Sequence, residues 1–331
     1  MPNVSENTRN WPSKIKAHLF QDKNTMKQIW LDLKTHLRED FSWKSYSLII
    51  GLVVLLTALS YSTNIEAEIY NNSSSNYFVF YSIFYPILFY VFVFLKSGIT
   101  PFKNKTFMIL SFIYVYCLAA NTGFIGYKSW IEDLPLYERF YVRNIIANSK
   151  GLFIIMGTMA LVYFAYERKN LPNFYGLSFK NHNFKPYLWL LLLMVPLIAG
   201  AATQADFLKA YPAFKPWKYE SIYGLSTNQM AWIFEGFYLF DFIRVEAIFR
   251  GALVIGLARF LGKDSVLIMA ALYCVFHFGK PLGETISSLF GGYLLGVIAL
   301  RQINIIGGCI VHMGIAGLMN LAAHIAHMLN S

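Results

Sequence analysis

The chain has 331 residues, of which 56% are hydrophobic and only 14% are charged. A typical soluble domain is about 45–50% apolar and about 25% charged. The apolar residues are also gathered into long blocks, which excludes a soluble globular enzyme, a disordered chain and a disulfide scaffold. The sequence therefore predicts an all-α, polytopic helical membrane protein.

The net charge of +10 does not indicate a nucleic-acid partner. The Lys and Arg residues lie between the apolar blocks, and no solvated face carries basic residues interleaved with aromatic ones. We expect membrane lipids as partners, and no nucleic acid. The three cysteines, Cys117, Cys274 and Cys309, fall inside apolar segments without metal-ligand spacing, so we expect buried free thiols.

The polar segment 1–44 contains apolar residues at helical spacing from Met26 to Leu37, with Lys27 and Lys34 among them. This pattern fits a helix that lies on an anionic membrane surface, and it fits equally an amphipathic helix packed on the rest of the protein. No apolar stretch begins before about residue 45, so we expect no cleavable signal peptide.

The remaining chain contains nine apolar segments that approach the roughly 20 residues needed to cross a bilayer. We therefore expect about eight or nine transmembrane helices, divided between an N-terminal membrane region at 45–229 and a helical core at 230–331. The sixth segment is too long for a simple crossing and is expected to be tilted or kinked. The predicted spans are 45–63, 77–95, 106–127, 151–166, 187–205, 230–260, 264–279, 283–300 and 303–329.

Most of the 28 Lys and Arg residues fall in segments that share one side of the membrane if every span crosses it. The positive-inside rule then predicts a cytoplasmic N-terminus. The short loops and the missing signal peptide favour the bacterial cytoplasmic membrane.

Charged residues inside apolar segments are costly and cluster after residue 230. Glu246 and Arg250 are four residues apart, so they share one helix face and the Arg can neutralise the carboxylate. Asp241 and Arg244 form a second such pair. The simplest interpretation is a set of buried ion pairs that fix helix packing.

His277 ends an apolar run just before the helix-breaking residues Gly279 and Pro281. A histidine at such a break is either hydrogen-bonded within the structure or faces a wet cavity. Glu284 follows, and can pair with Lys280 or cap the next helix.

His312 lies inside the last apolar segment, with Asn320 two turns further on. Three predicted helices thus contribute an acid–base set, which consists of Glu246 with Arg250, His277 and His312. Sets of this kind activate water or bind a metal. A metal would take Glu246, His277 and His312 as ligands. The sequence has no His-Glu-x-x-His spacing, and we expect no cofactor.

The order of these motifs resembles the CPBP family, the CAAX protease and bacteriocin-processing intramembrane proteases, over about residues 230–320. The family motifs are Glu-Glu-x-x-x-Arg, Phe-x-x-x-His and His-x-x-x-Asn. The corresponding segments here are Val245-Glu246-Ala-Ile-Phe-Arg250, Tyr273-Cys-Val-Phe-His277 and His312-Met-Gly-Ile-Ala316.

The resemblance implies an intramembrane endopeptidase with a peptide or membrane-protein substrate and a metal-independent glutamic mechanism. It assigns Glu246, Arg250, His277 and His312 to the catalytic set, with Glu246 and His277 activating water and His312 holding the oxyanion. Tyr273 keeps the aromatic body of the family Phe, while Glu284 and Asn320 are accessory candidates.

Two positions depart from the family pattern. The first Glu is Val245 and the Asn is Ala316, so the usual base and one oxyanion donor are missing. The alternative interpretation is therefore a catalytically impaired relative that binds a membrane partner in immunity or scaffolding. A proton-coupled transporter is a third interpretation, against which stands the lack of duplicated halves.

Overall fold

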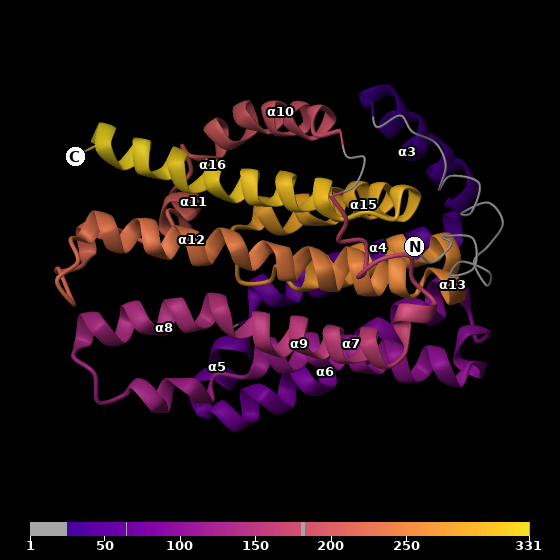
Figure 1. Cartoon of the computed structure of the whole chain (residues 1–331), viewed down its shortest axis with the longest axis horizontal. Helices are drawn as coiled ribbons and strands as arrows, with labels where there is room; N and C mark the ends of the chain where they lie inside the picture. The colour runs from indigo at the N-terminus through magenta and orange to yellow at the C-terminus, as the bar shows by residue number, and fades with distance from the viewer. Residues whose placement is uncertain (1–24, 64, 180–182, 331) are drawn as a thin grey trace.

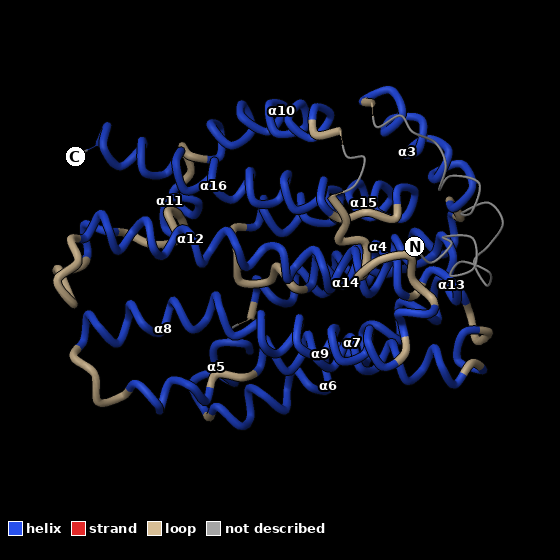
Figure 2. The backbone as a smooth tube through the Cα atoms, in the orientation of Figure 1, coloured by secondary structure: helices blue, strands red, loops and turns tan. Residues whose placement is uncertain are grey.

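The computed structural model describes residues 25–330 except 64 and 180–182 (Figure 1). Residues 1–24 of the predicted N-terminal segment therefore lie outside the described part. The described residues form helices and loops and no strand (Figure 2). The helices are α3 (Met26–Asp40), α4 (Trp43–Ser62), α5 (Ile65–Asn72), α6 (Ser74–Ser97), α7 (Lys105–Gly123), α8 (Leu136–Gly151), α9 (Gly157–Ala165), α10 (Lys185–Ala201), α11 (Ala205–Ala210), α12 (Thr227–Glu246), α13 (Ala258–Leu261), α14 (Ser265–Val275), α15 (Leu282–Gln302) and α16 (Ile306–Asn330).

The prediction of a polytopic helical membrane protein is confirmed. Each of the nine predicted spans overlaps helical backbone, and six helical stretches of the described chain are long and apolar enough to cross a membrane. These six stretches are Trp43–Ser62, Ser74–Ser97, Lys105–Ile131, Leu136–Ala165, Leu282–Gln302 and Ile306–Leu329.

The other three predicted spans differ from simple crossings. The predicted span 264–279 contains only the 11 helical residues of α14, which rise about 16 Å against a hydrocarbon core of about 30 Å. Every residue of α14 is buried. Because protein surrounds it on all sides, a short apolar helix is stable here without reaching both faces. Helix α10 has 17 residues, and the segment that begins with α12 carries several charges.

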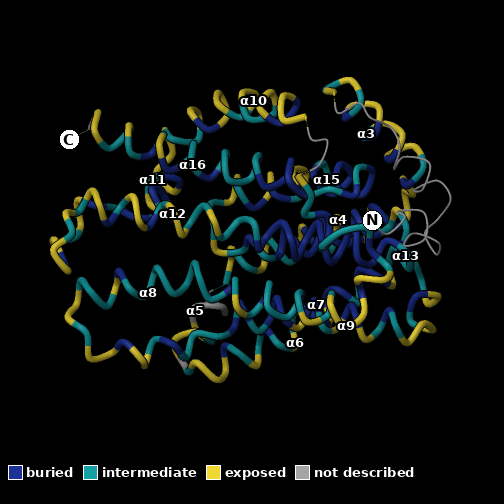
Figure 3. Tube along the Cα trace, in the orientation of Figure 1, coloured by how far each residue is buried: buried dark blue, intermediate teal, exposed yellow. Residues whose placement is uncertain are grey.

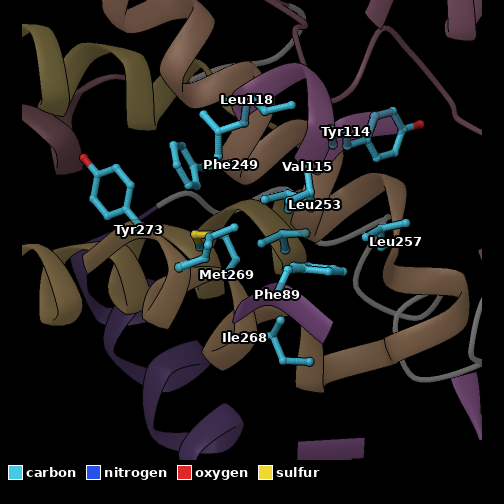
Figure 4. Close-up of a cluster of buried hydrophobic side chains, with 14 of the residues drawn as sticks. Phe89, Tyr114, Val115, Leu118, Phe249, Leu253, Leu257, Ile268, Met269 and Tyr273 are labelled. Atoms are coloured by element: carbon cyan, nitrogen blue, oxygen red, sulfur yellow. The ribbon is translucent and has the colours of Figure 1, made fainter. Parts of the chain in front are cut away.

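The long helices lie alongside one another, with α3 near one end of the bundle and the end of α16 at the other (Figure 1). Helix α6 packs on α7, α14 on α15, and α12 on both α8 and α16. Burial is greatest in the middle of the bundle around α14 (Figure 3). There, side chains from α6, α7 and the α12 segment interdigitate with α14 (Figure 4), and Phe89, Leu118 and Leu253 are almost fully buried.

Helix α12 has a defined start and an irregular end. A capping box begins it, in which the Ser226 hydroxyl accepts from the Gln229 amide and the Gln229 side chain accepts from the Ser226 amide. After Glu246 the backbone continues as the π-helical segment η6 (Ala247–Gly256). Wide turns of this kind are rare and are found frequently at functional sites. Every residue of η6 is buried, and Gly251 lies so close to the Tyr175 carbonyl that a Cβ would be 2.7 Å from its oxygen.

Helix α3 packs on the rest of the protein, which was one of its two predicted placements. Its buried face consists of Ile29, Asp32, His36 and Asp40, and it lies against α15 and the turn before α14. Lys96 reaches Asp40 from α6 at 3.0 Å. Outside this buried face, Trp30 is 65% exposed, so an aromatic side chain remains free to contact a membrane surface.

Candidate active site

Glu246 and Arg250 form the ion pair that their spacing predicted. Arg250 donates from Nη1 to Glu246 Oε1 at 2.9 Å, although the helix changes from α to π between them. Both side chains are buried, with relative exposures of 1% or less. Because a buried charge is expensive unless it is paired, each residue depends on the other to remain in this position.

His312 of α16 bonds to the same carboxylate oxygen. Its Nδ1 lies 2.9 Å from Glu246 Oε1, and since a carboxylate accepts, Nδ1 carries the proton. In the neutral ring Nε2 is then the acceptor, and the Tyr273 hydroxyl lies 3.1 Å from it. Tyr273 therefore donates to His312, which donates to Glu246, so the hydroxyl, imidazole and carboxylate form one continuous chain.

Tyr273 also connects this chain to His277. The Nδ1 of His277 donates to the Tyr273 carbonyl oxygen at 2.8 Å, which leaves Nε2 of the neutral His277 ring with its lone pair. The two rings are 4.4 Å apart between centroids, and the Arg250 guanidinium lies 4.3 Å above the Tyr273 ring. The Tyr273 ring belongs to the apolar cluster of Figure 4, whereas its hydroxyl points away from that cluster. One tyrosine thus contacts three predicted catalytic residues.

The second oxygen of Glu246 has a different environment. Oε2 is buried without a hydrogen-bond partner and lies against the backbone of Gly308. Both lone pairs of Oε1 are used by Arg250 and His312. The Glu246 side chain is fully buried, so the geometry suits a group that positions His312 better than a group that contacts water.

The two positions that depart from the family motifs, Val245 and Ala316, carry apolar side chains that are also buried in the structure. Val245 and Ala316 are each 4% exposed, and Val245 belongs to the main hydrophobic core. Neither position offers a proton acceptor or a hydrogen-bond donor from its side chain.

The accessory candidates Asn320 and Glu284 have partners of their own. Asn320 donates to Glu235 at 2.8 Å and accepts from the backbone amide of Ala213 at 2.9 Å. Glu284 accepts from Lys280 at 2.7 Å and from the Tyr211 hydroxyl at 2.6 Å. Both residues therefore fasten the 202–226 loop to the helical core and do not join the Glu246 chain.

The predicted metal ligands do not form a ligand group. In the part of the chain that the structure describes, no three or more His, Cys, Asp and Glu side chains are arranged to hold a metal ion. His277 Nδ1 and His312 Nδ1 are both engaged by protein oxygens. The three cysteines are free and buried, as expected.

Two contacting residues, one beside Glu246 and one beside Glu284, were not identified from sequence. The backbone of Gly308 makes room for the Glu246 carboxylate, and the Gly307-Gly308 pair just before His312 was the available signal. Tyr211 reaches the Glu284 carboxylate from a loop, and no local pattern marks that contact.

A comparison with known protein families finds a match over the segment that contains this site. Residues 227–318 match the family model described as Type II CAAX prenyl endopeptidase Rce1-like. This range contains all three motif segments and begins with the first residue of α12. No curated protein and no solved structure matches the chain.

Proposed function

Since the chain is a member of the CPBP (CAAX protease) family through residues 227–318, we propose that it is an intramembrane endopeptidase that hydrolyses a peptide bond. The observation that carries the proposal is the unbroken chain from the Tyr273 hydroxyl through His312 to Glu246, with His277 bonded to the Tyr273 backbone. A purely structural ion pair between Glu246 and Arg250 would not require the two histidines.

In the proposed reaction His277 is the general base. Its Nδ1 proton is held by a carbonyl oxygen, so Nε2 is the nitrogen that can accept a proton from water. The water oxygen attacks the peptide carbonyl carbon while its proton moves to Nε2. When the tetrahedral intermediate collapses, the C–N bond breaks and the His277 imidazolium gives its proton to the leaving nitrogen. The products are a carboxylic acid and an amine.

The oxyanion of that intermediate would accept a hydrogen bond from the Tyr273 hydroxyl, whose single proton turns from His312 Nε2 to the oxyanion in this step. This donor stands in for the Asn that Ala316 replaces, since Tyr273 carries a hydroxyl where the family motif has Phe. Glu246 and Arg250 are positioning residues in this scheme, because they fix the tautomer and orientation of His312. Removing an oxyanion donor costs about 10²–10³ in kcat in a characterised protease.

A second function is favoured by one specific observation. Val245 and Ala316 are buried and apolar where the family motifs carry Glu and Asn. A chain that had lost hydrolysis would keep the fold and its polar network and bind a membrane protein or peptide without cleaving it.

One experiment separates the two functions. The full chain is purified in detergent and incubated with a peptide library that includes peptides ending in a prenylated cysteine, and products are identified by mass spectrometry. For the endopeptidase we expect cleavage by the wild type and a loss of about 10²–10⁴ in rate for His277→Asn, which keeps a donor for the Tyr273 carbonyl. Lys218→Gln is the control, because Lys218 is exposed in the 202–226 loop.

Val245→Glu restores the first Glu of the motif and gives the decisive contrast. If the wild type is inactive and Val245→Glu cleaves, the natural chain is an impaired relative. Val245→Gln controls for the polar substitution. If no variant cleaves although all are folded, the endopeptidase proposal is withdrawn.

The protein is an integral membrane protein, and we infer that the α3 end of the bundle is cytoplasmic. The basic residues Lys96, Lys263 and Arg301 gather at that end, where they meet acidic side chains or backbone oxygens of α3. A bacterial cytoplasmic membrane fits this placement. Single cysteines at the exposed positions Lys34 and Lys218, labelled from outside intact cells with an impermeant maleimide, test it: only Lys218→Cys should react.

A further inference from the structure

A second feature lies on a different side of the His277 turn from the Glu246 chain. A cavity of about 480 Å³ is lined by the ends of α4, α7 and α14 together with parts of α6 and α8. Its walls are largely aromatic and include Phe80, Phe84, Phe276 and Phe278. Its volume falls within the roughly 300–1,000 Å³ of sites that bind small organic molecules.

One polar group in the cavity lacks a partner. Asn121, in the last turn of α7, lines the cavity and is only 5% exposed, and its Oδ1 is buried without a hydrogen bond. An unsatisfied buried polar atom is costly, so its retention calls for a further partner. Because an amide oxygen can only accept, that partner must be a donor.

Lys150 supplies a positive charge at the same cavity. It is the one charged side chain among the described lining residues. Its Nζ donates to the Phe124 carbonyl oxygen at 2.6 Å, which leaves two N–H groups for other acceptors. A cation beside an apolar wall favours a ligand with an anionic group.

The cavity lies in the half of the bundle away from α3. Leu59 belongs to the last turn of α4, Thr63 is its C-cap residue, and Asn121 belongs to the last turn of α7. Both helices start at the α3 end. Leu59 is 47% exposed and marks the rim. Asn121 and Lys150 thus lie level with the ends of α4 and α7, where lipid head groups meet a membrane protein. The helical stretch Leu136–Ala165 that contains Lys150 continues past this level.

From these observations we propose that the cavity binds an anionic membrane lipid whose head group carries hydroxyls, of the phosphatidylglycerol type. Its phosphate pairs with Lys150, a hydroxyl donates to Asn121 Oδ1, and one acyl chain lies along the aromatic wall. Phe276 and Phe278 flank His277, so the bound chain also supports the turn that carries His277. Binding itself does not depend on the proposed hydrolysis, whereas the effect on His277 does.

The test is native mass spectrometry of the delipidated full chain with defined lipids. Dioleoyl phosphatidylglycerol is compared with dioleoyl phosphatidylcholine, which has the same chains, and with glycerol 3-phosphate, which has no chain. We expect the wild type to retain one phosphatidylglycerol in preference to the other two. Lys150→Gln and Asn121→Leu should each weaken this binding by roughly tenfold or more. Lys218→Gln is the matched control and should bind like the wild type.

Leu59→Trp provides a variant that leaves both polar groups in place. A larger side chain at the rim should reduce binding of phosphatidylglycerol, with thermal unfolding monitored by circular dichroism to check folding. Equal binding of the two phospholipids, or equal loss in Lys150→Gln and Lys218→Gln, would overturn the proposal. Displacement of the lipid by a peptide with a prenylated cysteine would show instead that the cavity belongs to the substrate. Because the readout is bound mass, it stands whether or not the chain cleaves peptides.

Discussion

The backbone of Gly308 lies directly against the carboxylate of Glu246, where a Cβ would overlap Oε2. The first turn of α16 therefore has space for the charged pair only because residue 308 has no side chain. Gly308→Ala should displace the carboxylate from Arg250 and His312. We expect a loss of about 1–3 kcal/mol in unfolding free energy, as in other overpacked cores, and loss of any cleavage activity.

Gly317→Ala is the control on the same helix, because a Cβ there meets only ordinary contacts at 3.8 Å or more with Leu239. Replacing an unhindered helical Gly by Ala should raise stability by about 0.5–1 kcal/mol. Equal behaviour of the two variants in chemical unfolding would contradict the close packing at Gly308.

Glu246 and Arg250 should be strongly coupled in stability. Glu246→Leu leaves a buried guanidinium without its carboxylate, which typically costs about 3–5 kcal/mol. Arg250→Met leaves the buried carboxylate without its guanidinium. The double variant should lose much less unfolding free energy than the sum of the two single losses. A double-mutant cycle by chemical unfolding measures this coupling. Additive losses would indicate that the two charges do not depend on each other.

Tyr273→Phe should separate chemistry from packing. The variant keeps the ring that packs on Phe249 and His277 and removes the hydroxyl that donates to His312. We expect a loss of about 1 kcal/mol in stability and, for an active protease, a fall of about 10²–10³ in kcat. Unchanged kcat would remove Tyr273 from the oxyanion role, since the family motif carries Phe there.

The sequence predicted the helical membrane class and the pairing of Glu246 with Arg250 because both depend on strong local signals. Long apolar blocks have few structural solutions in a membrane, and the i,i+4 spacing of Glu246 and Arg250 places them on one helix face. The bond between Glu246 and His312 joins distant segments. The sequence placed the two residues in one acid–base set but did not predict the bond between them.

Other features could not be predicted, for identifiable reasons. The apolar stretch around α14 resembles a span, although it is a short helix enclosed by protein, because hydropathy does not distinguish burial in lipid from burial in protein. The predicted span started at residue 151, which left Lys150 in a loop. In the structure Lys150 is part of helix α8, which runs from Leu136 to Gly151. The cavity that it lines with Asn121 depends on how five helices diverge, which no local pattern encodes.

Asn320 should prove to be a structural residue. Its amide is used by Glu235 and by the Ala213 backbone, so Asn320→Leu should loosen the 202–226 loop without changing the Glu246 chain. We expect faster hydrogen exchange in the loop and a change of only a few-fold in any cleavage rate. A fall in kcat as large as that of Tyr273→Phe would instead assign Asn320 the oxyanion role that Ala316 has lost.

His36 should make the docking of α3 dependent on pH. The ring is fully buried against Tyr293, and neither ring nitrogen has a hydrogen bond. Burial lowers the pKa of His36 from 6.5 to about 4. The nearby charge of Asp40 opposes this shift, and the charges of Arg301, Lys263 and Lys96 add to it. An undocked His36 takes up a proton below about pH 6.5, whereas the docked ring stays neutral until about pH 4. Docking is therefore strongest above pH 6.5 and weakens as the pH falls, by roughly 1–2 kcal/mol at pH 5. Hydrogen exchange of residues 26–40 at pH 7.5 and pH 5, corrected for intrinsic rates, measures this difference. His36→Phe keeps an aromatic ring against Tyr293 and should remove the pH dependence, and a dependence of equal size in that variant would assign it to another group.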